Sequence, residues 1–306
     1  MRNSLILSTL LLLCACSNER AEQQPVKPSE IRPETASSNK ADPKKGLCCA
    51  QALYTHFSQA YQRSLKDFGT LKQASLDFIQ TPNTANLEQL QESWEQSHAS
   101  YQTAALSSLL SIRHPQLDIS ELQPNIIHPI AVRLDQYPML GGYLDEIPGY
   151  PNSGLIHSEF ELNFDNLNQE HQFSDPAYVT LGFHALAFML FGDSLDKDAQ
   201  LERFRAGAES TNILSRRKQY VSVLLKQIER DLTFLNEAWV QEGYYWQQLH
   251  QKDAQWFRQF SALLSSGAET TLHPHLREQF ASQQTTLVTL VSKTTNAAAS
   301  PAKTQP

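Results

Sequence analysis

The sequence predicts an all-α fold, organised as two helical-bundle domains with a long, loop-rich insert. Apolar residues recur at spacings of three and four over most of residues 50–292, and alternating β-branched runs are scarce. Proline and glycine separate these periodic stretches, which is typical of helices packed side by side. Of the 306 residues, 41% are hydrophobic and 19% are charged, so the chain can bury a substantial core.

The N-terminus has the features of a lipoprotein signal peptide over residues 1–15. Arg2 supplies the positive charge and residues 5–13 the apolar segment, which is too short to span a membrane. Residues 13–16, Leu-Cys-Ala-Cys, resemble a bacterial lipobox, which implies cleavage before Cys16 and attachment of lipid to its thiol. Ser17, in place of Asp, favours the outer membrane by resemblance to bacterial sorting rules. We therefore expect a lipid-anchored protein of the cell envelope that faces the periplasm or the surface.

The segments that flank the folded domain are predicted from their composition. Residues 16–46 are rich in Pro, Ser, Asn, Lys and Glu and have few aliphatic side chains, so we expect a flexible, lipid-anchored tether. Residues 293–306 are expected to form a disordered tail. The folded domain should span residues 47–292, with the boundary between its two bundle halves within residues 114–175.

The first two helices are predicted as a long antiparallel pair. The first should cover residues 50–80 and end at the Thr-Pro-Asn sequence of residues 81–83. Asn83 or Thr84 should cap the second, over about residues 86–111. Cys48 and Cys49, just before this pair, are the two thiols left after processing. These two residues lie at the start of the first helix or form a redox pair that is not always oxidised. Two thiolates cannot make a four-cysteine zinc site.

The insert from His114 to Gln172 is rich in proline and too long for a simple connector, so we expect it to contain short helices. Helices then resume, and glycines 192, 243 and 267 should mark their ends. The expected ranges are about 176–191, 198–206, 212–241, 244–266 and 274–292.

Charge and motifs exclude several classes of function. The formal net charge of -7 argues against a nucleic-acid partner, because no basic excess is available to neutralise phosphates. The sequence has no Gly-x-Ser-x-Gly, His-Glu-x-x-His, phosphate-loop or Gly-x-Gly-x-x-Gly motif. A metal ion, another small ligand or an envelope protein remains as the expected partner, together with the membrane that holds the lipid.

Four blocks of sequence, in order, resemble the imelysin family, and the likeness spans about residues 50–292. Residues 181–192 (LGFHALAFMLFG) are similar to its signature helix, Gly-x-His-x-x-Glu followed by an apolar run to Gly. Residues 133–138 (RLDQYP) are similar to an Arg-x-Asp-x-Trp-Pro segment. The other two blocks are residues 78–101 (FIQTPNTANLEQLQESWEQSHASY) and 212–239 (NILSRRKQYVSVLLKQIERDLTFLNEAW).

The resemblance implies a pair of helical bundles, an exported or lipid-anchored location and a site around the His-x-x-Glu motif. Members of the family have been described as metallopeptidases, as iron-regulated surface proteins and as periplasmic components of iron uptake. Residues i and i+3 of a helix share one face, so the imidazole and the carboxylate of the motif can reach one cation.

This sequence departs from the motif at its carboxylates. Ala187 stands where the family has Glu, which leaves His184 as the only ligand of the motif. Ala104 replaces the Glu of a Thr-Glu pair that follows the family's tyrosine, here Tyr101. Because ferric iron prefers several oxygen ligands, we expect a weak or absent family-type iron site and no peptide hydrolysis. A lone histidine in an apolar helix is more often a buried, neutral, hydrogen-bonded residue of the core than a metal ligand, and this alternative stays open for His184.

Other residues offer ligands for a metal or line a cleft. Glu95 and His98 are spaced as a pair on the second helix, and the insert offers His157, Glu159 and Glu161. Such spacings also arise by chance on polar helix faces. Arg133 and Asp135 are cleft candidates that we expect to form an ion pair with each other and hold the insert.

Aromatic residues gather near the turn between two C-terminal helices, where we expect most of them to be core anchors, with a sugar or partner surface as the alternative. They are Trp239, Tyr244, Tyr245, Trp246, Trp256, Phe257 and Phe260.

The sequence thus favours a non-catalytic, imelysin-like lipoprotein with a binding or accessory role at the cell envelope, in the acquisition of iron or another metal. Two alternatives stay open. One is a metallopeptidase with a rebuilt metal site, and the other is a protein-interaction module that keeps only the scaffold.

Overall fold

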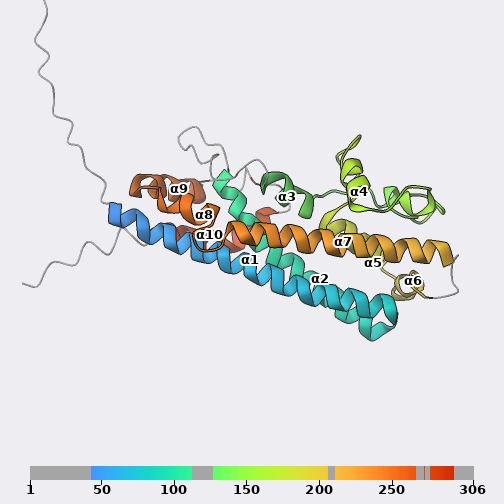
Figure 1. Ribbon diagram of the computed structural model, residues 1–306. Helices are drawn as coiled ribbons and strands as arrows, with labels where there is room; N and C mark the ends of the chain where they lie inside the picture. Colours follow the sequence, from blue (N-terminus) through green and yellow to red (C-terminus); the bar gives the residue numbers. More distant parts are fainter. Residues whose placement is uncertain (1–42, 112–126, 206–210, 267–271, 273–275, 293–306) are drawn as a thin grey trace, which may run out of the picture. The chain divides into compact units, whose positions relative to one another are not determined.

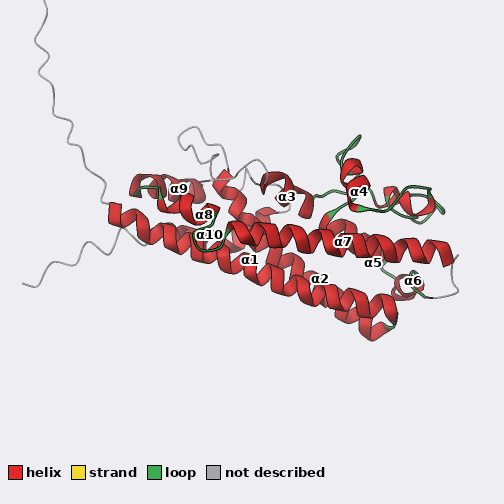
Figure 2. Ribbon diagram, in the orientation of Figure 1, coloured by secondary structure: helices red, strands yellow, loops and turns green. Residues whose placement is uncertain are grey.

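A computed structural model of the protein confirms the all-α class (Figure 1). It describes residues 43–111, 127–205, 211–266, 272 and 276–292. Within these ranges the regular elements are helices joined by loops, and no strand is present beyond one isolated bridge between Ile147 and Tyr150 (Figure 2). The predicted signal peptide, the predicted lipidation site at Cys16, the part of the predicted tether up to residue 42 and the predicted tail of residues 293–306 lie outside the described residues.

The first two helices form the predicted antiparallel pair. Helix α1 spans Pro43–Gln80 and α2 spans Thr84–Ala105, followed by the 3-10 helix η1 (Leu106–Ser111). Asn83 caps α2, because its side chain accepts a hydrogen bond from the backbone N–H of Asn86. Helix α1 begins earlier than the predicted residue 50, and residues 43–46, predicted as tether, are helical.

The described part of the insert contains short helices, as predicted. Helix α3 spans Ile127–Leu134, and the 3-10 helices η3 and η4 span Gly141–Tyr143 and Leu155–His157. Helix α4 spans Phe164–Glu170 and is capped by the side chain of Asn163.

The C-terminal half contains more breaks than predicted. Its helices are α5 (Gly182–Phe191), α6 (Lys197–Glu202), α7 (Thr211–Ala238), α8 (Tyr244–His250), α9 (Ala254–Ser266) and α10 (Arg277–Ser292). The single helix predicted over 244–266 is wrong, since Asp253 ends the break and caps α9 by accepting from the N–H of Trp256. The helix predicted from residue 176 begins at Gly182, because Leu181 is extended and Gly182 has φ = +89°.

Two of the predicted glycine stops fall in described residues, and they act differently. Gly192 ends α5 with φ = +70°, a left-handed conformation that glycine adopts without strain. Gly243 instead precedes α8 as its N-cap residue, so it starts a helix. Gly267 lies outside the described residues.

Helix α1 is shared by two groups of helices. It contacts α2 and α7, and it also contacts α8, α9 and α10 (Figure 1). Helix α7 in turn packs against α3 and α5. The described residues all belong to one compact unit.

The aromatic cluster is part of the core, as expected. Trp239 is 1% exposed and stacks on Tyr245 and, less closely, on Tyr61 of α1. The other buried members of the cluster are Trp256, Phe257 and Phe260.

Neither cysteine of the folded part forms a disulfide. Cys48 is exposed and Cys49 is buried, where its thiol lies 3.2 Å from the carbonyl oxygen of Val291 on α10. In the described part of the chain, no helix combines the length and the apolar character needed to cross a bilayer.

Candidate metal centre

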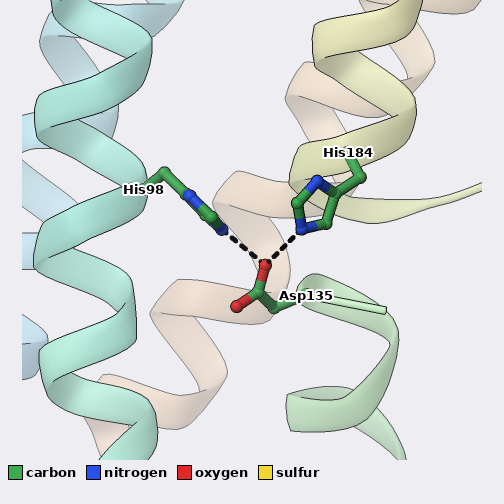
Figure 3. A group of neighbouring side chains, drawn as sticks. All are labelled: His98, Asp135 and His184. Carbon is green, nitrogen blue, oxygen red and sulfur yellow. Dashed lines mark hydrogen bonds and ion pairs between the residues drawn. The ribbon is translucent and has the colours of Figure 1, made fainter. Parts of the chain in front are cut away.

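Three potential metal ligands from three segments converge at one point (Figure 3). His98 lies on α2, Asp135 follows α3 directly, and His184 lies in the first turn of α5. The Nε2 atom of His98 is 2.6 Å from Oδ1 of Asp135, and the Nε2 atom of His184 is 3.0 Å from the same oxygen. Among the described residues these three form a group whose ligand atoms all lie within 4.8 Å of one another. The centre is mostly shielded from water, with 12%, 4% and 18% of the side chains of His98, Asp135 and His184 exposed.

The two imidazoles contact Asp135 differently. His98 and Asp135 are aligned as a hydrogen bond. His184 is as close as an ion pair, but its buried Nε2 atom has no aligned hydrogen-bond partner. A buried imidazole nitrogen without an aligned partner is costly in a folded protein unless something else binds it. This observation favours a ligand at His184.

Two imidazole nitrogens and one carboxylate oxygen are a suitable donor set for a divalent transition metal. Bonds of about 2.0–2.2 Å to such a cation place neighbouring ligand atoms about 3.4 Å apart. The observed separations of 2.6 and 3.0 Å are somewhat shorter, so the side chains need to move apart by less than about 1 Å to admit the ion. The residues therefore fit a cation, with coordination positions left for water or another ligand.

Aromatic side chains hold the two imidazoles in place. Trp94, one turn before His98 on α2, stacks on its ring with centroids 4.8 Å apart. The centroid of the Phe183 ring lies 5.6 Å from that of His98. The ring centroid of Tyr137 lies 5.0 Å from that of His184. Tyr137 is 50% exposed, so it is the most exposed of these three aromatic residues.

Glycine at position 182 brings two of the ligand-bearing segments together. A Cβ atom there would lie 2.3 Å from the carbonyl oxygen of Arg133 and 2.5 Å from that of Leu134. Only a residue without a side chain allows this approach at φ = +89°. The chain just before His184 can therefore pack directly against the chain just before Asp135.

The predicted ion pair between Arg133 and Asp135 is wrong. Arg133 donates from Nε and a terminal nitrogen to the carboxylate of Asp231 on α7, at 2.6 and 2.5 Å. Asp135 faces His98 and His184 instead. Residues two apart at a helix end point in different directions, which is why neighbours in sequence have different partners here.

The two alanines that the sequence resemblance aligns with glutamates of the family lie in different environments. Ala187 is one turn after His184 on α5 and is partly exposed. Ala104 is fully buried in the hydrophobic core, six residues and therefore about 9 Å along α2 from His98.

The alternative ligand sets are not assembled. Glu95 is exposed on α2, whereas His98 is directed to Asp135. Glu159 and Glu161 are also exposed, whereas His157 is turned inward, with Nε2 3.3 Å from Oδ1 of Asp145.

Asp145, which no motif in the sequence marks, is a buried carboxylate that anchors the insert. Arg217 of α7 donates to it at 2.6 Å and Arg203 at 2.9 Å. Burial alone would raise the pKa of Asp145, but the hydrogen bond from Arg217 and the charges of both arginines outweigh it and lower the pKa. With two guanidinium groups on one carboxylate, this cluster has the character of a structural ion-pair network and not of a cation site.

Comparison with known proteins places the chain in a family. Residues 57–298 match the family profile described as Imelysin, which is well over half of the chain. A comparison with curated proteins finds no significant match. The sequence blocks, the all-α architecture and the profile agree, and the chain belongs to the imelysin family.

Proposed function

We propose that this imelysin-family protein is a metal-binding, non-hydrolytic protein of the cell envelope that acts in metal acquisition. The observation that carries the proposal is the convergence of His98 and His184 on Asp135 in a shielded site. In the sequence, His184 is the only ligand of its motif, which predicts weak binding. With His98 and Asp135 beside it, His184 is one of three donors.

The donor set favours divalent transition metals over ferric iron. Two nitrogen donors suit Zn²⁺, Cu²⁺, Ni²⁺ or Fe²⁺, whereas Fe³⁺ prefers a site richer in oxygen. Ala187 and Ala104 supply no oxygen ligand where the family has glutamates. We therefore propose that the cargo is a divalent ion.

The metallopeptidase alternative has less support. A two-histidine, one-carboxylate set can hold a catalytic zinc, and hydrolysis then needs a further group to take a proton from the metal-bound water. Among the described residues, no fourth His, Cys, Asp or Glu joins the cluster, and its only carboxylate is used as a ligand. This is why we favour binding over hydrolysis.

Isothermal titration calorimetry of the purified chain with Zn²⁺, Cu²⁺ and, without oxygen, Fe²⁺ tests the proposal. We expect one site per chain that is lost in His98→Ala, His184→Ala and Asp135→Asn. His250→Ala is the matched control, because His250 is a partly buried histidine stacked on Trp246 of α8 and remote in sequence from the cluster. No site in the unaltered chain, or one that survives both cluster histidine variants, would overturn the proposal. Metal-dependent cleavage of an unfolded protein substrate would favour the peptidase.

The envelope location is part of the same proposal and rests on the lipobox-like residues 13–16. We expect Cys16→Ser to prevent processing and to release the protein from the membrane fraction. Unchanged processing and fractionation of that variant would contradict lipid anchoring.

A further inference from the structure

A hydrogen-bonded chain on α7 links two of the ligand-bearing segments of the metal centre. The side-chain oxygen of Gln227 accepts a hydrogen bond from the backbone N–H of Gly182 at 3.0 Å. The side-chain nitrogen of Gln227 donates to Oδ2 of Asp231, one turn further along α7, at 2.6 Å. Asp231 in turn accepts the two hydrogen bonds from Arg133. This series of hydrogen bonds therefore connects the start of α5 to the end of α3.

Each end of this hydrogen-bonded series is two residues from a proposed metal ligand. Gly182 precedes His184, and Arg133 precedes Asp135. Gln227 and Asp231 are 2% and 1% exposed, so water does not replace their hydrogen bonds. A shift of α5 relative to α3 has to break one of these bonds or move α7 with it.

We propose that Gln227 is a positioning residue for the metal centre, which fixes the distance between His184 and Asp135 through Asp231 and Arg133. The inference rests on the proposed metal-binding function.

The amide of Gln227 suits both of its partners. The position must accept from a backbone N–H on one side and donate to a carboxylate on the other, and the amide does this with two separate atoms, its oxygen and its nitrogen. A glutamate would place a second carboxylate against Asp231, and an apolar residue would leave both the Gly182 N–H and one oxygen of Asp231 without this partner. Outer residues that orient metal ligands typically change metal affinity by about 10–100-fold when they are altered.

The test compares two buried glutamines. Gln227→Met removes the link, and Gln200→Met is the matched control. Gln200 is 5% exposed on α6 and its amide also makes two hydrogen bonds, from Gln91 and to the carbonyl oxygen of Ser194. We expect both variants to lose stability. Gln227→Met alone should weaken Zn²⁺ binding by about 10–100-fold and change the visible spectrum of bound Co²⁺.

Two further variants keep the test decisive. If Gln227→Met does not fold, Arg133→Lys is the second variant. It weakens the contact with Asp231 at a partly exposed residue, and it should weaken Zn²⁺ binding in the same way. The double change Gln227→Glu with Asp231→Asn exchanges amide and carboxylate while it keeps one negative charge in this pair of residues. We expect it to bind Zn²⁺ more tightly than Gln227→Glu alone.

Nuclear magnetic resonance of the histidine rings in the metal-free protein separates this inference from the proposed function. The resonances of His184 should shift in Gln227→Met and stay in place in Gln200→Met. If the unaltered chain binds no metal but these shifts occur, the positioning role stands and the metal-binding proposal fails. If the chain binds Zn²⁺, and Gln227→Met changes neither the affinity nor the His184 resonances, the positioning role is overturned.

Discussion

Trp94 donates its indole N–H to the backbone carbonyl oxygen of Phe183, at 3.3 Å. This bond joins the two helices that carry the histidines of the candidate metal centre. Trp94 also stacks on His98 one turn later on α2, and Phe183 directly precedes His184 on α5. One side chain therefore orients one imidazole and holds the backbone beside the other.

Trp94→Phe is expected to keep most of the stacking and to lose the hydrogen bond. The free energy of unfolding should fall by about 1–2 kcal/mol, from the lost bond and the smaller ring. Zn²⁺ affinity should fall less than in His98→Ala, because all three ligands remain. Denaturant unfolding and calorimetry measure the two quantities. An affinity as low as that of His98→Ala would contradict the assignment of Trp94 as a support for His98.

Gly182→Ala is expected to destabilise the protein by more than about 2 kcal/mol, because the new Cβ meets two carbonyl oxygens at a positive φ. Gly69→Ala is the control. Gly69 lies within α1, a Cβ there meets no atom within 4 Å, and the change should stabilise the helix by about 0.5–1 kcal/mol. The midpoint of urea unfolding should therefore be lower for Gly182→Ala and higher for Gly69→Ala than for the unaltered chain. A neutral Gly182→Ala would show that α3 and α5 can separate without cost.

His171 gives the stability of the protein a pH dependence in the mildly acidic range. Burial, reinforced by the charge of Arg133, lowers the pKa of His171 to about 4 from its ordinary value of 6.5. Its Nδ1 atom also accepts a hydrogen bond from the N–H of Thr180, which requires the neutral ring. Between about pH 6.5 and pH 4 the ring of His171 is therefore protonated in the unfolded chain but neutral in the folded chain. As far as this ring is concerned, the free energy of unfolding is highest above about pH 6.5 and decreases as the pH falls towards 4.

The corresponding loss is roughly 2–3 kcal/mol between pH 7 and pH 4.5. His171→Asn retains a hydrogen-bond acceptor but no titrating ring, and its stability should depend less on pH in this window. Urea unfolding at several pH values measures the difference. If the free energy of unfolding changed equally with pH in His171→Asn and in the unaltered chain, the assignment of this pH dependence to His171 would be contradicted.

The helices could be predicted because their apolar periodicity and their caps are local features. Asn83 and Gly192 act as their residue types suggest. The break before α9 was missed because residues 251–253 contain neither proline nor glycine, although Asp253 has the side chain of a helix cap. Cap residues inside a periodic stretch are therefore informative even without a helix breaker.

The candidate metal centre could be predicted only in fragments. His98, Asp135 and His184 were each identified, but in three separate hypotheses, because they are far apart in the sequence. Their convergence depends on the packing of α2, α3 and α5, which periodicity does not specify. Gln227 has no sequence signal at all, since a glutamine within a helix is usually exposed. Its role follows from burial and from its two hydrogen-bond partners.

The two alanines that the sequence resemblance aligns with glutamates of the family should respond oppositely to an introduced carboxylate. Ala187 is partly exposed and one turn from His184, so Ala187→Glu adds an oxygen ligand on the same face of α5. Ala104 is fully buried, so Ala104→Glu forces a charge into the core and should cost more than about 3 kcal/mol of stability.

Calorimetry and urea unfolding of both single variants test this contrast, with Ala99→Glu, at an exposed position of α2, as the control for an added charge. Ala187→Glu should raise the affinity for Fe³⁺ by at least about tenfold, which corresponds to about 1.4 kcal/mol, because ferric iron prefers oxygen donors. It should leave the stability close to that of the unaltered chain. An unchanged Fe³⁺ affinity would mean that the side chain at position 187 does not reach the ion, and the loss of the family's glutamate would then not explain a preference for divalent metals.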